Sequence, residues 1–165
     1  MSDDAMPVPP LAVIDIDGVL ADVRHRLHHV AHPPKDWDAF FAAAGSDAVL
    51  DEGRAVAERL DEDHELVYLS GRPERCRRDT VAWLRRHSLP DGRVLLRPEG
   101  DRRPARLFKL DRLCDLATGR EVGVLVDDDP AVCDAARRRG FVVFEATWMR
   151  QPPGLYEAQE EEGRT

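Results

Sequence analysis

The chain has 165 residues, 34% of them charged, and a formal net charge of −8. This length is typical of one domain with a sizeable core, and the acidic balance argues against a broad basic face for duplex nucleic acid, although a local basic groove remains compatible with it. No apolar run reaches the roughly 18 residues of a membrane span, and residues 1–10 lack the apolar core of a signal peptide, so we expect a flexible N-terminus there and no membrane contact. Three widely spaced cysteines, Cys76, Cys114 and Cys133, fit neither a disulfide framework nor a zinc motif and indicate a reducing cytoplasm.

Five short apolar runs alternate with amphipathic segments along the chain. The runs predict strands at 11–14, 66–69, 94–96, 122–126 and 141–144. The amphipathic segments predict helices at 53–61, 74–87, 107–117 and 131–139. This alternation is typical of an α/β fold, in which a parallel sheet is buried between helices on both faces.

A small helical insert is expected at about 24–45, after the first strand. Its first segment, 24–32, carries four histidines with i,i+4 spacings, which can hold zinc, but no cysteine or carboxylate lies beside them. A polar helix that faces solvent or substrate is the simpler interpretation. Residues 11–150 therefore form the expected domain, and the acidic tail 151–165, with three consecutive glutamates, is expected to be disordered.

Polar side chains follow four of the five predicted strands. They are Asp15 and Asp17 after the first strand, Ser70 after the second, Arg97 after the third, and Asp127 and Asp128 after the fourth. Because the carboxyl ends of parallel strands share one edge of a sheet, we expect these side chains to converge. The Asp-x-Asp-Gly sequence that ends in Gly18 is by itself equally compatible with a polar turn, and the convergence favours a site.

These residue types suit phosphoryl transfer. Asp15 can attack phosphorus and form an acyl phosphate, and Asp17 can protonate the leaving oxygen and then deprotonate the attacking water. Ser70 and Lys109, one of only two lysines in the chain, can bind the phosphoryl oxygens. Magnesium prefers oxygen ligands, which Asp15, the main-chain carbonyl of Asp17 and an acid after the fourth strand can supply.

In this order and on these elements, the residues resemble the four motifs of the haloacid dehalogenase-like (HAD) phosphatases over about residues 11–148. The motifs are Asp15-Ile16-Asp17-Gly18, Ser70, Lys109 and Asp127-Asp128. The resemblance implies a Rossmann-like sheet of strand order 3-2-1-4-5, magnesium, and an aspartyl-phosphate intermediate. It favours Asp128 over Asp127 as the metal ligand.

Within these phosphatases, the chain bears a closer resemblance to the 3′-phosphatase domain of phage-type polynucleotide kinase-phosphatase. The matches are Arg26, nine residues after Asp17, then Ser70-Gly71-Arg72, and a loop with Arg97, Gly100, Asp101 and Arg103. The departures are Val19 for threonine, Ala105 for an acid and Asp129 for arginine. No kinase phosphate-binding loop, G-x-x-x-x-G-K-[ST], occurs in the sequence.

The resemblance therefore implies a magnesium-dependent phosphatase acting on a 3′-phosphorylated nucleotide or polynucleotide end. The substrate-binding residues it implies are Gly71, Arg72, Arg26, Arg97 and Arg103. A small-molecule phosphatase for a nucleotide or sugar phosphate is the alternative, and a non-catalytic module that binds phosphate or nucleic acid is a more remote one. No feature of the sequence indicates an obligate protein partner.

Overall fold

A computed structural model describes residues 7–149 and 153–164 and has a five-stranded parallel sheet at its centre. The strands are β1 (Leu11–Ile14), β4 (Glu65–Pro73), β5 (Gly92–Arg97), β6 (Val122–Asp127) and β7 (Val143–Glu145). Their spatial order is β5-β4-β1-β6-β7, and every neighbouring pair is parallel. Counted along the chain within this sheet, the order is 3-2-1-4-5. The predicted α/β fold is confirmed.

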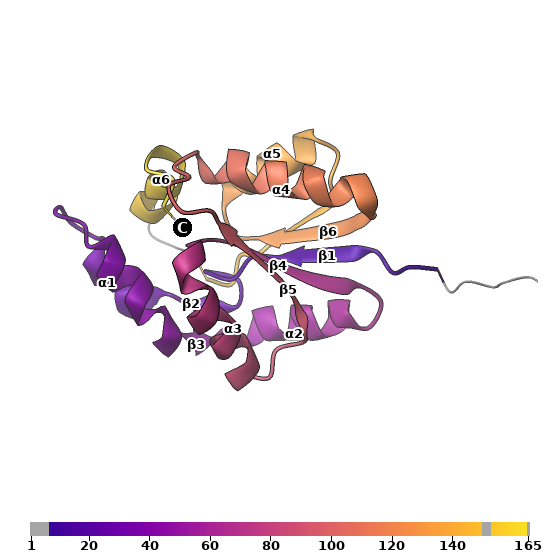
Figure 1. Ribbon diagram of the computed structural model, residues 1–165, viewed down its shortest axis with the longest axis horizontal. Helices are drawn as coiled ribbons and strands as arrows, with labels where there is room; N and C mark the ends of the chain where they lie inside the picture. The colour runs from indigo at the N-terminus through magenta and orange to yellow at the C-terminus, as the bar shows by residue number, and fades with distance from the viewer. Residues whose placement is uncertain (1–6, 150–152, 165) are drawn as a thin grey trace, which may run out of the picture.

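Helices cover both faces of the sheet (Figure 1). Helices α2 (Asp51–Asp61) and α3 (Arg77–Arg86) lie on one face, and α4 (Ala105–Gly119) and α5 (Pro130–Arg138) lie on the other. Successive residues of β1 point to opposite faces of the sheet. Ile14 belongs to the apolar cluster that contains Trp83 of α3, and Val13 belongs to the cluster that contains Phe108 of α4. Burial on both faces explains why the strands are apolar throughout rather than alternating.

The ends of several elements differ from the predicted ones. Strand β4 continues to Pro73, and its register shifts so that Pro73 pairs with Arg97. A short 3-10 helix, η3 (Glu74–Cys76), then precedes α3. These ends depend on backbone pairing with a neighbouring strand, which the hydrophobic pattern does not reveal.

The insert after β1 begins and ends in a two-stranded antiparallel ribbon that the sequence did not predict. The ribbon strands are β2 (Ala21–Asp22) and β3 (Ala48–Val49), and between them lie η1 (Arg24–His29), α1 (Trp37–Ala42) and η2 (Ala43–Ser46). Two-residue strands leave no alternation in the sequence. The insert has its own apolar cluster, which includes Trp37, Phe40 and Phe41.

The C-terminal segment forms a helix, α6 (Pro153–Glu161), where the sequence predicted a disordered tail over 151–165. Leu155 and Ala158, three residues apart, are buried against the cluster of the insert. This apolar pair gives the segment a face that can be buried. The composition did not reveal that face, because the neighbouring glutamates make the segment acidic as a whole. In Figure 1, α6 lies near the N-terminal end of α4, above the insert.

Residues 1–6 of the predicted flexible N-terminus, and residues 150–152, lie outside the described part of the chain. Residues 7–10 precede β1 without helix or strand. Within 7–149 and 153–164, no helix combines the length and the apolar character needed to cross a membrane.

Candidate active site

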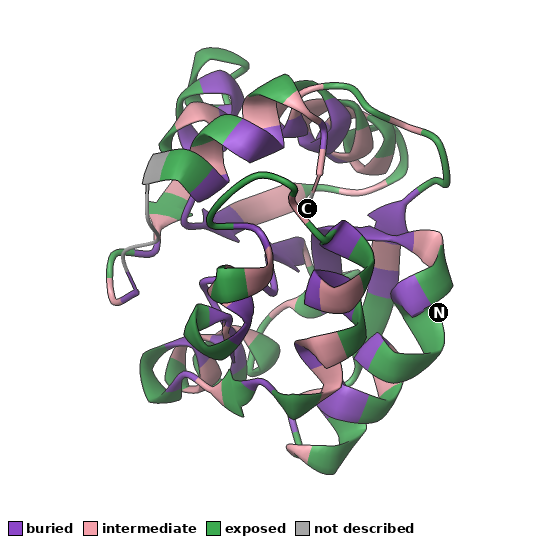
Figure 2. Ribbon diagram, turned by 90° about the vertical axis from the view of Figure 1, so that its left-hand side faces the viewer, coloured by how far each residue is buried: buried purple, intermediate pink, exposed green. Residues whose placement is uncertain are grey.

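The strand ends meet at one edge of the sheet, between the insert and α6. Figure 2 looks onto the side toward which β1 runs in Figure 1, and buried segments lie at its centre. Asp15 follows β1, Ser70 lies in β4, Asp127 ends β6 and Asp128 follows it. The structure therefore brings to one edge the residues that the sequence predicted to converge there.

Lys109 of α4 joins the ends of β1 and β6. Its Nζ atom lies 2.9 Å from Oδ2 of Asp15 and 2.6 Å from Oδ2 of Asp127. The three side chains are buried. The other oxygen of Asp15 accepts a hydrogen bond from the Ile16 amide at 2.8 Å, which fixes the orientation of this carboxylate.

Three buried carboxylates form a group that fits a metal ion. Asp15, Asp127 and Asp128 each offer one oxygen, and these oxygens lie within 4.8 Å of one another. Lys109 balances one of their charges, and buried like charges this close are costly without further cationic compensation. A set of carboxylate oxygens is the donor set that Mg²⁺ prefers. The residues present thus fit the expected ion.

The side chain of Asp17 belongs to a second group. Gly18, with φ of +82°, turns the chain after Asp17, and the Ala21 amide closes the turn on the Ile16 carbonyl at 2.9 Å. Oδ1 of Asp17 accepts from Nη2 of Arg26 at 2.9 Å and from Nη2 of Arg72 at 2.6 Å. The main-chain carbonyl of Asp17, not this carboxylate, stays the predicted metal ligand.

Asp47, which sequence reasoning missed, completes that second group. Its Oδ2 lies 2.8 Å from Nη2 of Arg26 and 3.0 Å from Nη2 of Arg72, so the two arginines bridge Asp47 and Asp17. His25 contacts Oδ1 of Asp47 at 2.7 Å, and the Trp83 indole donates to its carbonyl at 2.8 Å. No periodic pattern marked Asp47, because it lies between η2 and β3, outside both elements.

The environments of Asp15 and Asp17 shift their pKa values in opposite directions. Burial raises the pKa of Asp15 to about 7, with Asp127 adding to the rise and Lys109 opposing it. Burial also disfavours ionised Asp17, but Arg72 and Arg26 outweigh it and lower the pKa of Asp17 to about 2. For Lys109, burial disfavours the charged form, but Asp127 and Asp15 raise its pKa above the ordinary value. Such opposed carboxyls are typical of acid–base sites.

The remaining predicted substrate-binding residues differ in accessibility. Gly71 is buried in β4, and the Ser70 hydroxyl accepts from the Arg72 amide at 3.2 Å. Arg97 is buried over the Phe108 ring and donates to the Arg103 carbonyl at 2.8 Å. Burial lowers the pKa of Arg97 to about 10.

Arg103 itself is exposed. Its guanidinium pairs with Asp101 at 2.9 Å and also with Asp111. Of the four arginines proposed to contact substrate, Arg103 is the one with an exposed side chain. Arg26 and Arg72 are turned toward Asp17 and Asp47.

The histidines of the insert do not assemble into a metal site within the described residues. His25 is engaged with Asp47, and the rings of His28 and His29 lie 4.0 Å apart. The contact of His25 with Asp47 places this histidine beside the buried group of Asp47, Arg26 and Arg72.

The hydroxyl of Tyr156, on α6, lies 3.1 Å from Oδ2 of Asp128. Sequence reasoning missed it because it falls in the segment expected to be disordered. The apolar spacing of Leu155 and Ala158 was the signal that could have predicted a helix there.

The chain is similar to known proteins in sequence and in fold. The sequence model of the family described as "Polynucleotide kinase PNKP phosphatase domain" matches residues 9–148. No curated protein sequence matched the chain.

Solved structures share the fold. Chains from "Structure of Pnkp1/Rnl/Hen1 complex" and "Structure of the Pnkp1/Rnl/Hen1 RNA repair complex" align with a TM-score of 0.71 each, at 20% and 22% identity. The alignments cover 88% and 87% of this chain but 48% and 44% of theirs, so it spans about half their length. A haloacid dehalogenase-like hydrolase from Streptococcus pneumoniae aligns with a TM-score of 0.60 at 13% identity, over 92% of this chain and 90% of its own.

Proposed function

The chain belongs to the family of PNKP phosphatase domains within the HAD phosphatases, and from this membership we propose that it is a magnesium-dependent phosphomonoester hydrolase. The observation that carries the proposal is the contact of Lys109 with both Asp15 and Asp127 beside Asp128. The proposed nucleophile, the proposed phosphate ligand and the proposed metal ligands thus lie within one buried cluster.

The proposed reaction has two steps at Asp15. Oδ of Asp15 attacks phosphorus, the bond to the leaving oxygen breaks, and Asp17 delivers a proton to that oxygen. Asp17 then takes a proton from water, which attacks the phosphorus of the acyl phosphate and releases phosphate and the free Asp15 carboxylate.

The phosphoryl oxygens carry the charge that the site must stabilise. Lys109 and the Ser70 hydroxyl are proposed to bind them. A magnesium ion held by Asp15, the Asp17 carbonyl and Asp128, with Asp127 beside them, would supply further positive charge and favour the ionised form of Asp15.

The two arginines beside Asp17 favour its carboxylate form, which suits the base of the second step. In the first step Asp17 must hold a proton. The incoming phosphoryl group favours this, because its negative charge opposes the effect of Arg26 and Arg72.

We propose a 3′-phosphorylated nucleotide or polynucleotide end as the favoured substrate. Family membership supports this, and so does Arg103, an exposed cation on the loop before α4 that suits a second phosphate. The three free cysteines fit a reducing compartment, and we place the protein in the cytoplasm.

One observation favours the alternative, a phosphatase for small nucleotides or sugar phosphates. Arg26 and Arg72 are buried against carboxylates, so they are not turned toward a second phosphate. Such a substrate needs no further phosphate contact.

A phosphate-release assay separates these possibilities. We expect release from a 3′-phosphorylated oligonucleotide with magnesium and none with excess chelator. Faster release from mononucleotides or sugar phosphates than from the oligonucleotide would support the alternative. No release from any phosphomonoester would support the non-catalytic module.

A further inference from the structure

The C-terminal helix α6 brings a tyrosine to the proposed metal ligands. The Tyr156 hydroxyl lies 3.1 Å from Oδ2 of Asp128, and an oxygen of Asp128 lies within 4.8 Å of oxygens from Asp15 and Asp127. A tyrosine hydroxyl is a neutral donor at neutral pH. It can therefore orient Asp128 without adding a positive charge that would compete with a cation.

Helix α6 is anchored to α4 on one side. Glu160 accepts from the Arg106 amide at 3.2 Å, and its carboxylate lies 3.1 Å from Nε of Arg106. Arg106 and Lys109 are three residues apart on α4. The helix that carries Tyr156 is thus attached to the helix that carries the catalytic lysine.

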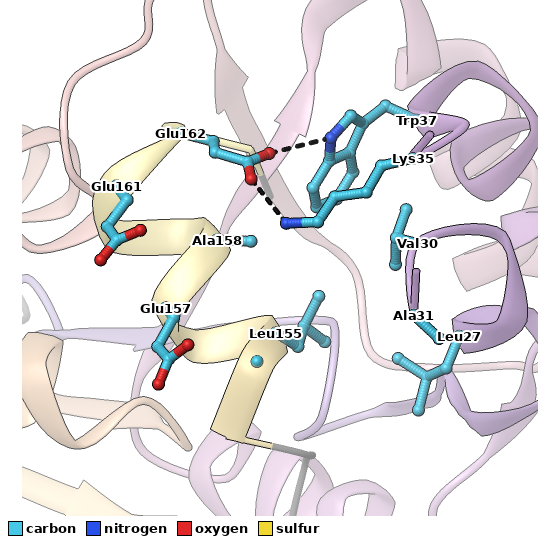
Figure 3. A pocket seen from close by; sticks show the side chains of 11 residues that line it. Leu27, Val30, Ala31, Lys35, Trp37, Leu155, Glu157, Ala158, Glu161 and Glu162 are labelled. Carbon is cyan, nitrogen blue, oxygen red and sulfur yellow. Dashed lines mark hydrogen bonds and ion pairs between the residues drawn. The ribbon is translucent and has the colours of Figure 1, made fainter. Parts of the chain in front are cut away.

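On its other side, α6 is anchored to the insert (Figure 3). Glu162, just after α6, accepts from Nζ of Lys35 at 2.5 Å and from the Trp37 indole at 3.1 Å. Leu155 and Ala158 are buried in the apolar cluster of the insert, and both also line a pocket of about 350 Å³ between α6 and the insert. Because this pocket leaves part of the interface unpacked, we expect the contacts of Glu162 to be important for docking the helix.

We propose that Tyr156 is a positioning residue for Asp128, and that metal binding at the site depends on the docking of α6 between α4 and the insert. The inference rests on the proposed function, since it takes Asp128 to be a metal ligand. The hydroxyl holds the carboxylate in one orientation before the cation binds, so binding does not have to order it. The loss of such an outer contact weakens metal binding by about 10- to 100-fold in typical sites.

The test is a calorimetric titration of the full chain with magnesium chloride, compared among the wild type, Tyr156→Phe and Tyr68→Phe. Tyr68 is the other tyrosine of the chain, and its hydroxyl donates to the Pro90 carbonyl at 2.6 Å, away from the carboxylate cluster. We expect about tenfold weaker binding for Tyr156→Phe and an unchanged affinity for Tyr68→Phe. Both variants keep the aromatic ring, and circular dichroism checks their fold.

A second variant tests the role of docking. Lys35 lies on the insert, and the substitution Lys35→Met removes its ion pair with Glu162. We expect it to weaken magnesium binding too, and the double variant Lys35→Met/Tyr156→Phe to bind no more weakly than Tyr156→Phe alone. Fully additive losses would overturn the dependence on docking.

The outcomes separate this inference from the proposed function. If the wild type binds magnesium and Tyr156→Phe binds it with the same affinity, the inference is overturned and the proposed function is not. Equal weakening by both tyrosine variants would also overturn it, since it would show a general loss of stability. A wild type that binds no magnesium would overturn the proposed metal site and the inference with it.

Discussion

The Nη2 atom of Arg26 lies 2.9 Å from Oδ1 of Asp17, so a residue of the insert holds the proposed general acid of the core domain. Arg26 is fully buried, and its guanidinium lies 4.3 Å from the centre of the Phe40 ring. The insert therefore contributes a side chain that contacts Asp17. Together with Arg72 of β4, this side chain favours the ionised carboxylate of Asp17.

The first prediction concerns the acid limit of stability. The pKa of Asp17 is lowered from 3.8 to about 2, so ionised Asp17 stabilises the fold above about pH 4, and this contribution is lost as the pH falls through 2. We expect it to be worth about 2 kcal/mol of unfolding free energy. Urea unfolding of the wild type and Asp17→Asn should show a constant difference from pH 7 to 4 that narrows below pH 4. A difference that stays constant down to pH 3 would contradict the low pKa.

The second prediction concerns Asp47. Asp47→Asn removes a charge that Arg26 and Arg72 share with Asp17, and breaking a buried ion pair in this way costs about 3–5 kcal/mol. We expect this loss in urea unfolding, together with a lower kcat because Asp17 is less firmly oriented.

The matched control is Asp38→Asn, which removes another aspartate–arginine pair that links the insert to the rest of the chain, here to Arg75 of η3 at 2.9 Å. The Asp38 side chain is 91% exposed, so we expect a loss of less than about 1 kcal/mol. Similar losses for both variants would show that the buried group has no special role.

Much of the core fold could be predicted because its chemical residues directly follow apolar runs. Asp15 comes after β1 and Asp127 ends β6, so parallel strands alone place them at one edge. The strand order came from the resemblance and not from the pattern.

The rest of the site depends on approaches between distant segments. Asp47 meets Arg72 across 25 residues of sequence, and nothing local to either residue marks the contact. The resemblance implied that Arg26 and Arg72 bind substrate, and it gave no sign that both also contact Asp47. The helix of Tyr156 was missed because a run of glutamates outweighed two apolar residues in the composition.

The third prediction distinguishes the role of Arg72 from that of Arg103. Because Arg72 is bonded to Asp17, Arg72→Ala should lower kcat/KM about a hundredfold or more, both on a 3′-phosphorylated oligonucleotide and on a small phosphate ester. Arg103→Ala should raise KM for the oligonucleotide alone, since Arg103 is exposed and its ion pairs are with Asp101 and Asp111.

Salt provides the check on this prediction. Binding of a backbone phosphate by Arg103 should weaken as ionic strength rises, so wild type and Arg103→Ala should converge at high salt on the oligonucleotide. If Arg72→Ala impairs the oligonucleotide far more than the ester, then Arg72 contacts the substrate chain and its role at Asp17 is secondary.

The last prediction concerns Asp15, whose replacement by asparagine should abolish the activity of the protein but stabilise its magnesium-free form at pH 8. Asp15→Asn should abolish turnover, because an amide cannot form the acyl phosphate. Burial raises the pKa of Asp15 from 3.8 to about 7, so in magnesium-free protein the stability it contributes is complete below about pH 4 and is lost as the pH rises through 7. The neutral asparagine avoids this loss, and Asp15→Asn without magnesium should unfold at a higher temperature than the wild type at pH 8 but not at pH 4.

Asp134→Asn, at an exposed position of α5, is the control and should change neither activity nor this pH dependence. Phosphate release by folded Asp15→Asn at the wild-type rate would exclude Asp15 as the nucleophile, and equal melting temperatures at pH 8 would exclude the raised pKa.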